Sequence, residues 1–185
     1  GAVYVGGATC IIEHCVFSNN FSHPYGLRRG GAVYATGLQT LRIVSNDFQR
    51  NWLAGKTING AAICVFDCTN TLVDSCTLDG SELLLGTAPE LVYVKGGTAR
   101  FLGSTLRNNN VGSGLYFGGA AAELEMTNCV FTGNNGGGVT IAGGRAFLLN
   151  CLLAQNSGSG LGLSAGTATV ANCTLADNGE WGLSW

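Results

Sequence analysis

Charged residues are scarce in this chain of 185 residues. They make up only 11% of it and leave a net charge of −2, whereas soluble domains usually carry about 25%. No basic patch marks a nucleic-acid surface. Only two prolines occur beside 30 glycines. So many glycines, with few lysines and glutamates, argue against a helix bundle and favour a β-rich chain with many tight turns.

Long apolar runs are also missing. No stretch of 18 apolar residues occurs, so the sequence predicts no membrane span. No signal peptide is recognisable, and the first residue is Gly1 rather than methionine. We therefore expect a mature product or a segment of a longer chain.

A repeat runs through the whole chain. Seven segments follow the pattern Cys-x-Phe/Leu-x-x-Asn, with substitutions at each position. Their Phe/Leu positions are Phe17, Phe48, Leu78, Leu106, Phe131, Leu153 and Leu175. The spacing between them falls from 31 residues to a constant 22. A fixed period of this length indicates a solenoid, in which each repeat buries its apolar face against its neighbours.

Alternating strands flank these positions. Five and three residues before each Cys-like position the side chains are mostly apolar, as in Leu41 and Ile43. The residues between them vary freely: Ile11, Arg42, Leu72, Arg100, Glu125, Phe147 and Thr169. A second alternating strand opens each repeat, as in Val33-Tyr34-Ala35. Such alternation is typical of strands with one buried face.

These features predict an all-β fold, a right-handed single-stranded parallel β-helix of about seven rungs of 22–31 residues. A 22-residue coil is too long for the left-handed solenoid with 18 residues per turn. We expect one β-helix domain over residues 1–185, with longer rungs in 1–90 and plain rungs in 91–185.

Stacking places like residues above one another. The asparagines that end the motif, such as Asn109 and Asn134, are predicted to form a hydrogen-bonded ladder. We expect them at the corner itself, because asparagine tolerates left-handed backbone. The cysteine column is predicted to hold buried free thiols, since side chains in register on stacked strands point the same way about 4.8 Å apart, farther than the usual Cβ separation in a disulfide. Cys64 and Cys68 are the best pair if any bridge exists.

Four tyrosines stand at outward positions of the opening strands. They are Tyr4, Tyr34, Tyr93 and Tyr116. Together they predict an aromatic stripe on one sheet, which could stack on sugar rings or contact a protein. The alternative is that tyrosine simply favours strands.

The extra length of the early rungs falls at one corner. Its three loops are Phe21–Gly31, Trp52–Gly60 and Glu82–Glu90, and we predict that they stack into one ridge. The candidate binding residues there are His23, Tyr25, Arg28, Arg29, Trp52 and Lys56. Loops on a rigid scaffold often bind ligands. The alternative is that the ridge packs against the side of the β-helix and binds nothing.

No catalytic, metal-binding or cofactor-binding group is identifiable. Glycoside hydrolysis needs two paired carboxylates, and the acidic residues here are few and scattered. Asp47 and Asp74 would at best be neighbours on adjacent rungs, and neither has a cationic partner in register. We therefore expect a protein that is not an enzyme and has no cofactor.

The segments Phe17–Asn20, Phe48–Asn51 and Phe131–Asn134, with Gly30-Gly31-Ala32-Val33, resemble the repeats of polymorphic outer membrane proteins. Similar repeats occur in other surface proteins and in pectate-lyase-like β-helices. The resemblance covers nearly the whole chain. It implies a surface-structural or adhesin-like role and supplies no catalytic residues.

The leading hypothesis is thus a non-catalytic structural or adhesive module, extracellular or at the cell surface. Its expected partners are proteins or further copies of itself, which would stack end to end into a filament. The alternative is a carbohydrate-binding or polysaccharide-processing β-helix, with glycans as partners.

Overall fold

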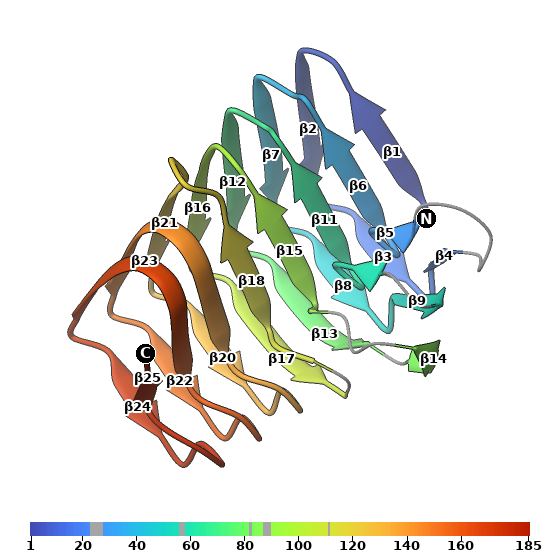
Figure 1. Ribbon diagram of the computed structural model, residues 1–185. Coiled ribbons are helices and arrows are strands. Elements are labelled where there is room, and N and C mark those ends of the chain that lie inside the picture. The colour runs from blue at the N-terminus through green and yellow to red at the C-terminus, as the bar shows by residue number, and fades with distance from the viewer. Residues whose placement is uncertain (23–27, 56–57, 82, 87–89, 111) are drawn as a thin grey trace.

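The computed structural model describes residues 1–22, 28–55, 58–81, 83–86, 90–110 and 112–185. The chain winds into a right-handed parallel β-helix, as the repeat predicts (Figure 1). Seven rungs are complete, and the last strand begins an eighth. The described residues contain no helix with the length and hydrophobicity of a membrane span.

Three parallel walls surround the core. The first consists of β1 (Val3–Gly6), β6 (Val33–Thr36), β11 (Ile63–Phe66), β15 (Val92–Lys95), β18 (Leu115–Gly118) and β25 (Leu183–Ser184). The second consists of β2 (Thr9–Glu13), β7 (Thr40–Val44), β12 (Asn70–Asp74), β16 (Thr98–Leu102) and β19 (Glu123–Thr127). In the late rungs the long strands β21 (Val139–Leu149) and β23 (Leu161–Ala171) run through both walls.

The third wall carries the repeat motif. It consists of β3 (Val16–Ser18), β8 (Asp47–Gln49), β13 (Thr77–Ser81), β17 (Thr105–Asn109), β20 (Val130–Thr132), β22 (Leu152–Ala154) and β24 (Thr174–Ala176). Its register aligns Phe17 with Phe48, and Leu106 with Phe131 and Leu153. The Phe/Leu positions therefore form one column, as the sequence pattern predicts.

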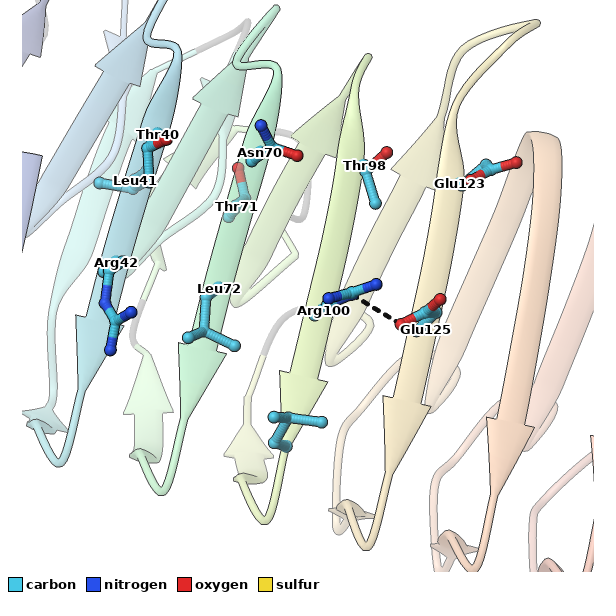
Figure 2. A pocket seen from close by; sticks show the side chains of 11 residues that line it. Thr40, Leu41, Arg42, Asn70, Thr71, Leu72, Thr98, Arg100, Glu123 and Glu125 are labelled. Atoms are coloured by element: carbon cyan, nitrogen blue, oxygen red, sulfur yellow. Dashed lines mark ion pairs between the residues drawn. The ribbon is translucent and has the colours of Figure 1, made fainter. Parts of the chain in front are cut away.

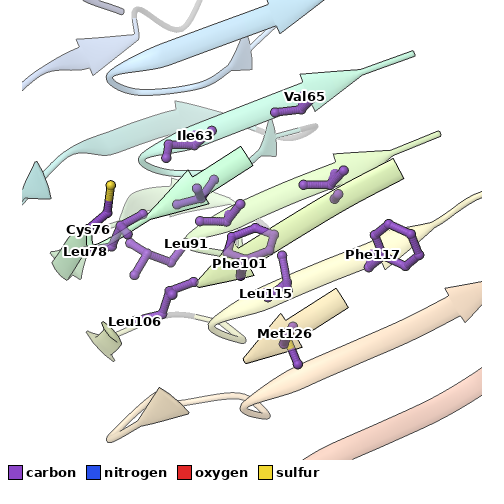
Figure 3. Close-up of a cluster of buried hydrophobic side chains, with 14 of the residues drawn as sticks. Ile63, Val65, Cys76, Leu78, Leu91, Phe101, Leu106, Leu115, Phe117 and Met126 are labelled. Atoms are coloured by element: carbon purple, nitrogen blue, oxygen red, sulfur yellow. The ribbon is translucent and has the colours of Figure 1, made fainter. Parts of the chain in front are cut away.

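The core is a stack of such columns. Apolar side chains from all three walls meet inside, for example Ile63 and Phe117 from the first wall and Phe101 from the second (Figure 3). Phe17 and Phe48 stack with their ring centroids 4.9 Å apart. Because every rung repeats the same inward positions, burial extends along the axis without a break between rungs.

The asparagine ladder exists, but its backbone differs from our expectation. Asn109, Asn134 and Asn156 are buried, and the amide oxygen of each later asparagine accepts a hydrogen bond from the backbone N–H of the one before. The left-handed residue is the preceding one, such as Asn108 or Gln155. The prediction that ladder asparagines themselves take this geometry was wrong. The turn needs positive φ one residue earlier, so the ladder amide can point inward to the neighbouring rung.

All eight cysteines are free. The column thiols are hydrogen-bond donors; Cys129 Sγ lies 3.3 Å from the carbonyl oxygen of Phe101. Cys64 and Cys68 are both fully buried and unbridged. Cys15, at the start of the column, is exposed, so the expectation of burial fails at that position.

Thiol labelling should therefore separate the cysteines. In the folded chain we expect rapid reaction at the exposed Cys15 and strong protection of the five buried thiols. In urea without reductant all eight should react. Two missing thiols under those conditions would reveal a bridge and contradict the structure. The measurement is a colorimetric thiol count over time.

The inserted loops stack, as predicted. The short strands β4 (Phe21–Ser22), β9 (Trp52–Gly55) and β14 (Leu83–Gly86) pair in a three-stranded sheet. Beside it, β5 (Arg28–Arg29) pairs with β10 (Ile58–Asn59). These segments form a ridge along the early rungs (Figure 1), next to the corner where the first wall begins.

Candidate functional site

An aromatic stripe runs along the outer face of the first wall. Tyr4 aligns with Tyr34, and Tyr93 aligns with Tyr116. The rings of Tyr93 and Tyr116 are parallel within 1°, with centroids 4.7 Å apart. Tyr4 and Tyr34 lie 5.3 Å apart and are tilted by 33°. The structure therefore confirms that the four predicted tyrosines share one face.

Cys64 interrupts the tyrosine column in the third rung. It occupies the position between Tyr34 and Tyr93. Phe66, two residues later on the same strand, supplies the missing ring, which stacks on Tyr93 at 5.2 Å and meets the edge of Tyr34 at 6.4 Å. The stripe is thus continuous over five rungs.

The direction of the tyrosine side chains explains why Phe66 can fill this gap. A Cβ added at Gly118 would lie 3.1 Å from the ring of Tyr116, so that ring extends along the strand over the residue two positions on. Phe66 stands at the equivalent position in its own rung. Phe66 lies outside the tyrosine column, in the column of Thr36 and Lys95, so the tyrosine pattern of the sequence does not predict it.

Arg29 connects the ridge to the stripe. It belongs to β5 in the first inserted loop, and its guanidinium carbon lies 3.9 Å from the ring centroid of Phe66. Its Nη1 donates a hydrogen bond of 2.7 Å to the hydroxyl of Tyr34. A cation over an aromatic face is attractive, and more so when partly desolvated. Ridge and stripe therefore form one surface, held together by Arg29.

Burial controls ionisation beneath this surface. Desolvation raises the pKa of the Cys64 thiol well above its usual range, and the nearby Arg29 opposes this only in part. Desolvation also raises the pKa of the Glu90 carboxyl. The pKa of Tyr93 is raised to about 12, first by desolvation and then by the neighbouring Tyr116. None of these shifts produces a reactive nucleophile at neutral pH.

The Tyr93 shift predicts a pH dependence. Because the pKa of this hydroxyl is near 10 in the unfolded chain and about 12 in the folded chain, stability should fall as the pH rises through that window. Ultraviolet titration of the wild type against Tyr93→Phe should assign one tyrosinate to about pH 12. A difference signal already complete near pH 10 would contradict the packing of this ring.

The ridge residues are placed only in part. Trp52 is half-buried and stacks on Phe21, with centroids 4.1 Å apart. Arg28 pairs through its backbone with Ile58. The candidates His23, Tyr25 and Lys56 lie outside the described residues. Of the two ridge candidates whose side chains the structure describes, Trp52 and Arg29, it is Arg29 that lies against the stripe.

A second concave surface lies on the second wall, where the sequence predicted no site. Side chains of β7, β12, β16 and β19 line a groove there (Figure 2). Its volume is about 540 Å³. Leu72 lies between Arg42 and Arg100 along the axis, and Arg100 forms a 2.7 Å ion pair with Glu125. The residues that line it are outward ones that differ from rung to rung, so the repeat itself does not predict a groove here.

Asp47 and Asp74, which the sequence placed at best on adjacent rungs, lie on different walls. Asp47 lies on the third wall, aligned with Val16 and Thr77, and accepts a hydrogen bond from Gln49. Asp74 lies on the second wall and accepts one from Ser75. The described residues include no group of three or more His, Cys, Asp or Glu side chains suited to a metal ion.

Comparison with known proteins agrees with the geometry. No curated protein and no solved structure gives a significant match. The family model described as "Right handed beta helix region" matches residues 1–149 and, in an overlapping second match, residues 88–184. These two matches span almost the whole chain. The chain therefore belongs to the family of proteins with a right-handed β-helix region.

Proposed function

We propose that this protein is a non-catalytic structural or adhesive module that acts outside the cell or at its surface. Its contact surface is the aromatic stripe together with the ridge, and its partner is a protein. The observation that carries the proposal is the continuous row of rings from Tyr4 to Tyr116, joined to the ridge by Arg29.

The ring geometry favours a protein over a sugar. Stacking on a sugar needs an open aromatic face, but Phe66, Tyr93 and Tyr116 cover one another's faces along the column. The ring faces that a sugar would need are therefore largely occupied by neighbouring rings. Tyrosine and arginine on a rigid scaffold are the side chains most enriched in protein interfaces.

The alternative is a carbohydrate-binding or polysaccharide-processing protein. Trp52 favours it, because a half-buried tryptophan on a loop can offer a ring to a sugar. The groove on the second wall, lined by Thr40, Asn70 and Arg42, adds polar groups that could bind hydroxyls.

A glycan array separates the two functions. We expect no saturable binding of the 185-residue chain to any glycan. Saturable binding that falls about tenfold or more in Trp52→Ala or Tyr34→Ala would support the carbohydrate function and overturn the proposal. Arg107→Ala, on the third wall, is the control, since its side chain only pairs with Asp79 at the surface.

A further inference from the structure

The outer face of the second wall is complementary to itself. We propose that two copies of this chain pair face to face through this wall, related by a two-fold axis parallel to the strands. This interface is distinct from the stripe and the ridge, and from end-to-end stacking. It does not depend on the function proposed above.

The symmetry determines which residues meet. Rotation about an axis along the strands preserves the position within a strand and reverses the order of the rungs. With the axis between β12 and β16, the second rung of one copy faces the fifth rung of the other. The central outward column, from Ile11 to Phe147, then faces the same column of the second copy with the rungs in the opposite order.

Each facing pair in this central column is favourable. Arg42 meets Glu125 of the second copy, an ion pair across the interface. Ile11 and Phe147, which are 57% and 47% exposed, cover each other. Leu72, which lines the groove, receives the aliphatic stem of Arg100 from the second copy.

The two flanking columns contain no like-charge pair. In the column nearer the strand start, Thr40 faces Glu123 and Asn70 faces Thr98, and both pairs can form hydrogen bonds. In the column nearer the strand end, Val44 faces Thr127, whereas the carboxylates of Asp74 and Glu13 face Leu102 and Leu149, which offer no hydrogen bond. The complementarity therefore lies in the central column and in the column nearer the strand start, and the carboxylates near the strand ends must keep their contact with water.

Other registers are worse. Moving the second copy by one rung brings Arg100 against either Arg42 or another Arg100, which is repulsive. Moving it by two rungs toward the C-terminal end leaves Ile11 uncovered and puts Arg42 opposite Thr169. The proposed register is the one that gives Arg42 a counter-ion, and no ion pair within the described part of the chain supplies one.

The size of the wall sets the strength of the dimer. Five-residue strands at about 3.3 Å per residue and six rungs at about 4.8 Å give a face of about 16 Å by about 29 Å. About 900 Å² would then be buried in total, which is typical of a weak, reversible interface. We therefore expect a dimer in the micromolar range that weakens as salt increases.

The test is sedimentation velocity over a concentration series, with a charge swap. We expect the wild type to pass from monomer to dimer, and Arg42→Glu to raise the dissociation constant about tenfold or more. Because Glu125 also pairs with Arg100 in its own chain, the rescue reverses that pair too: the triple variant Arg42→Glu/Arg100→Glu/Glu125→Arg should restore affinity to within about threefold of the wild type. Arg42 and Glu125 lie three rungs apart within one chain, about 14 Å, so rescue requires contact between copies.

Lys95→Glu, on the first wall, is the matched charge reversal and should leave the dimer unchanged. Circular dichroism checks that each variant is folded. A wild type that stays monomeric at every concentration would overturn the proposal. A folded triple variant that fails to recover would also overturn it, as would growth into larger oligomers that Arg42→Glu leaves unchanged.

Discussion

Phe131→Ala is expected to lower the free energy of unfolding by about 3 to 5 kcal/mol, because it removes an entire ring from the core. Phe131 is fully buried and lies in the third-wall column between Leu106 and Leu153. Its loss leaves a cavity that the rigid neighbouring rungs cannot close. Urea unfolding followed by circular dichroism measures the change.

Phe131→Leu is the matched control. The adjacent rungs already use leucine at this position, so we expect a cost of about 1.5 kcal/mol or less. Equal costs for the two variants would contradict the stacked column. Because a solenoid need not unfold in one step, the midpoints should be compared by more than one probe.

Asn156→Ala is expected to cost about 2 to 4 kcal/mol, because it unpairs several buried groups at once. The amide oxygen of Asn156 accepts hydrogen bonds from the backbone N–H and the side chain of Asn134. Its amide nitrogen donates to the carbonyl of Phe131 and to Asn178. Alanine leaves the buried groups of Asn134 and Phe131 without these partners.

The neighbouring turn offers the control. Asn135 also donates from its side chain to a carbonyl in the preceding rung, that of Asn110, but it is exposed. Asn135→Ala should therefore cost about 1 kcal/mol or less. A similar loss in both variants would show that burial of the ladder amide contributes nothing, which is the opposite of what the corner geometry predicts.

The fold could be predicted because its signal repeats. The Phe/Leu and asparagine positions recur along the chain, so a different residue at a single repeat position, such as Ser81 or Ser104, does not hide the pattern. The backbone of the corner was harder to predict. Asparagine suits both an inward ladder and a left-handed turn, and sequence alone does not tell Asn108 from Asn109.

The candidate site could be predicted only in part. The tyrosines follow from strand alternation, whereas Phe66 and the buried Cys64 depend on where the rings lie along the strand. The position of Arg29 depends on a loop without any repeat. The groove on the second wall is lined by residues that differ from rung to rung. Their complementarity depends on their order along the axis, which the repeat does not encode.

The proposed function depends on the stripe, and one binding experiment tests it most directly. The immobilised chain is exposed to the extracellular protein fraction of its source cells, and retained proteins are quantified for wild type, Tyr93→Ala and the control Arg107→Ala. We predict that the wild type and the control retain the same protein in a saturable manner, and that Tyr93→Ala loses about tenfold or more of it. Retention that is equal in all three variants, or no retention by the wild type, would contradict the proposal.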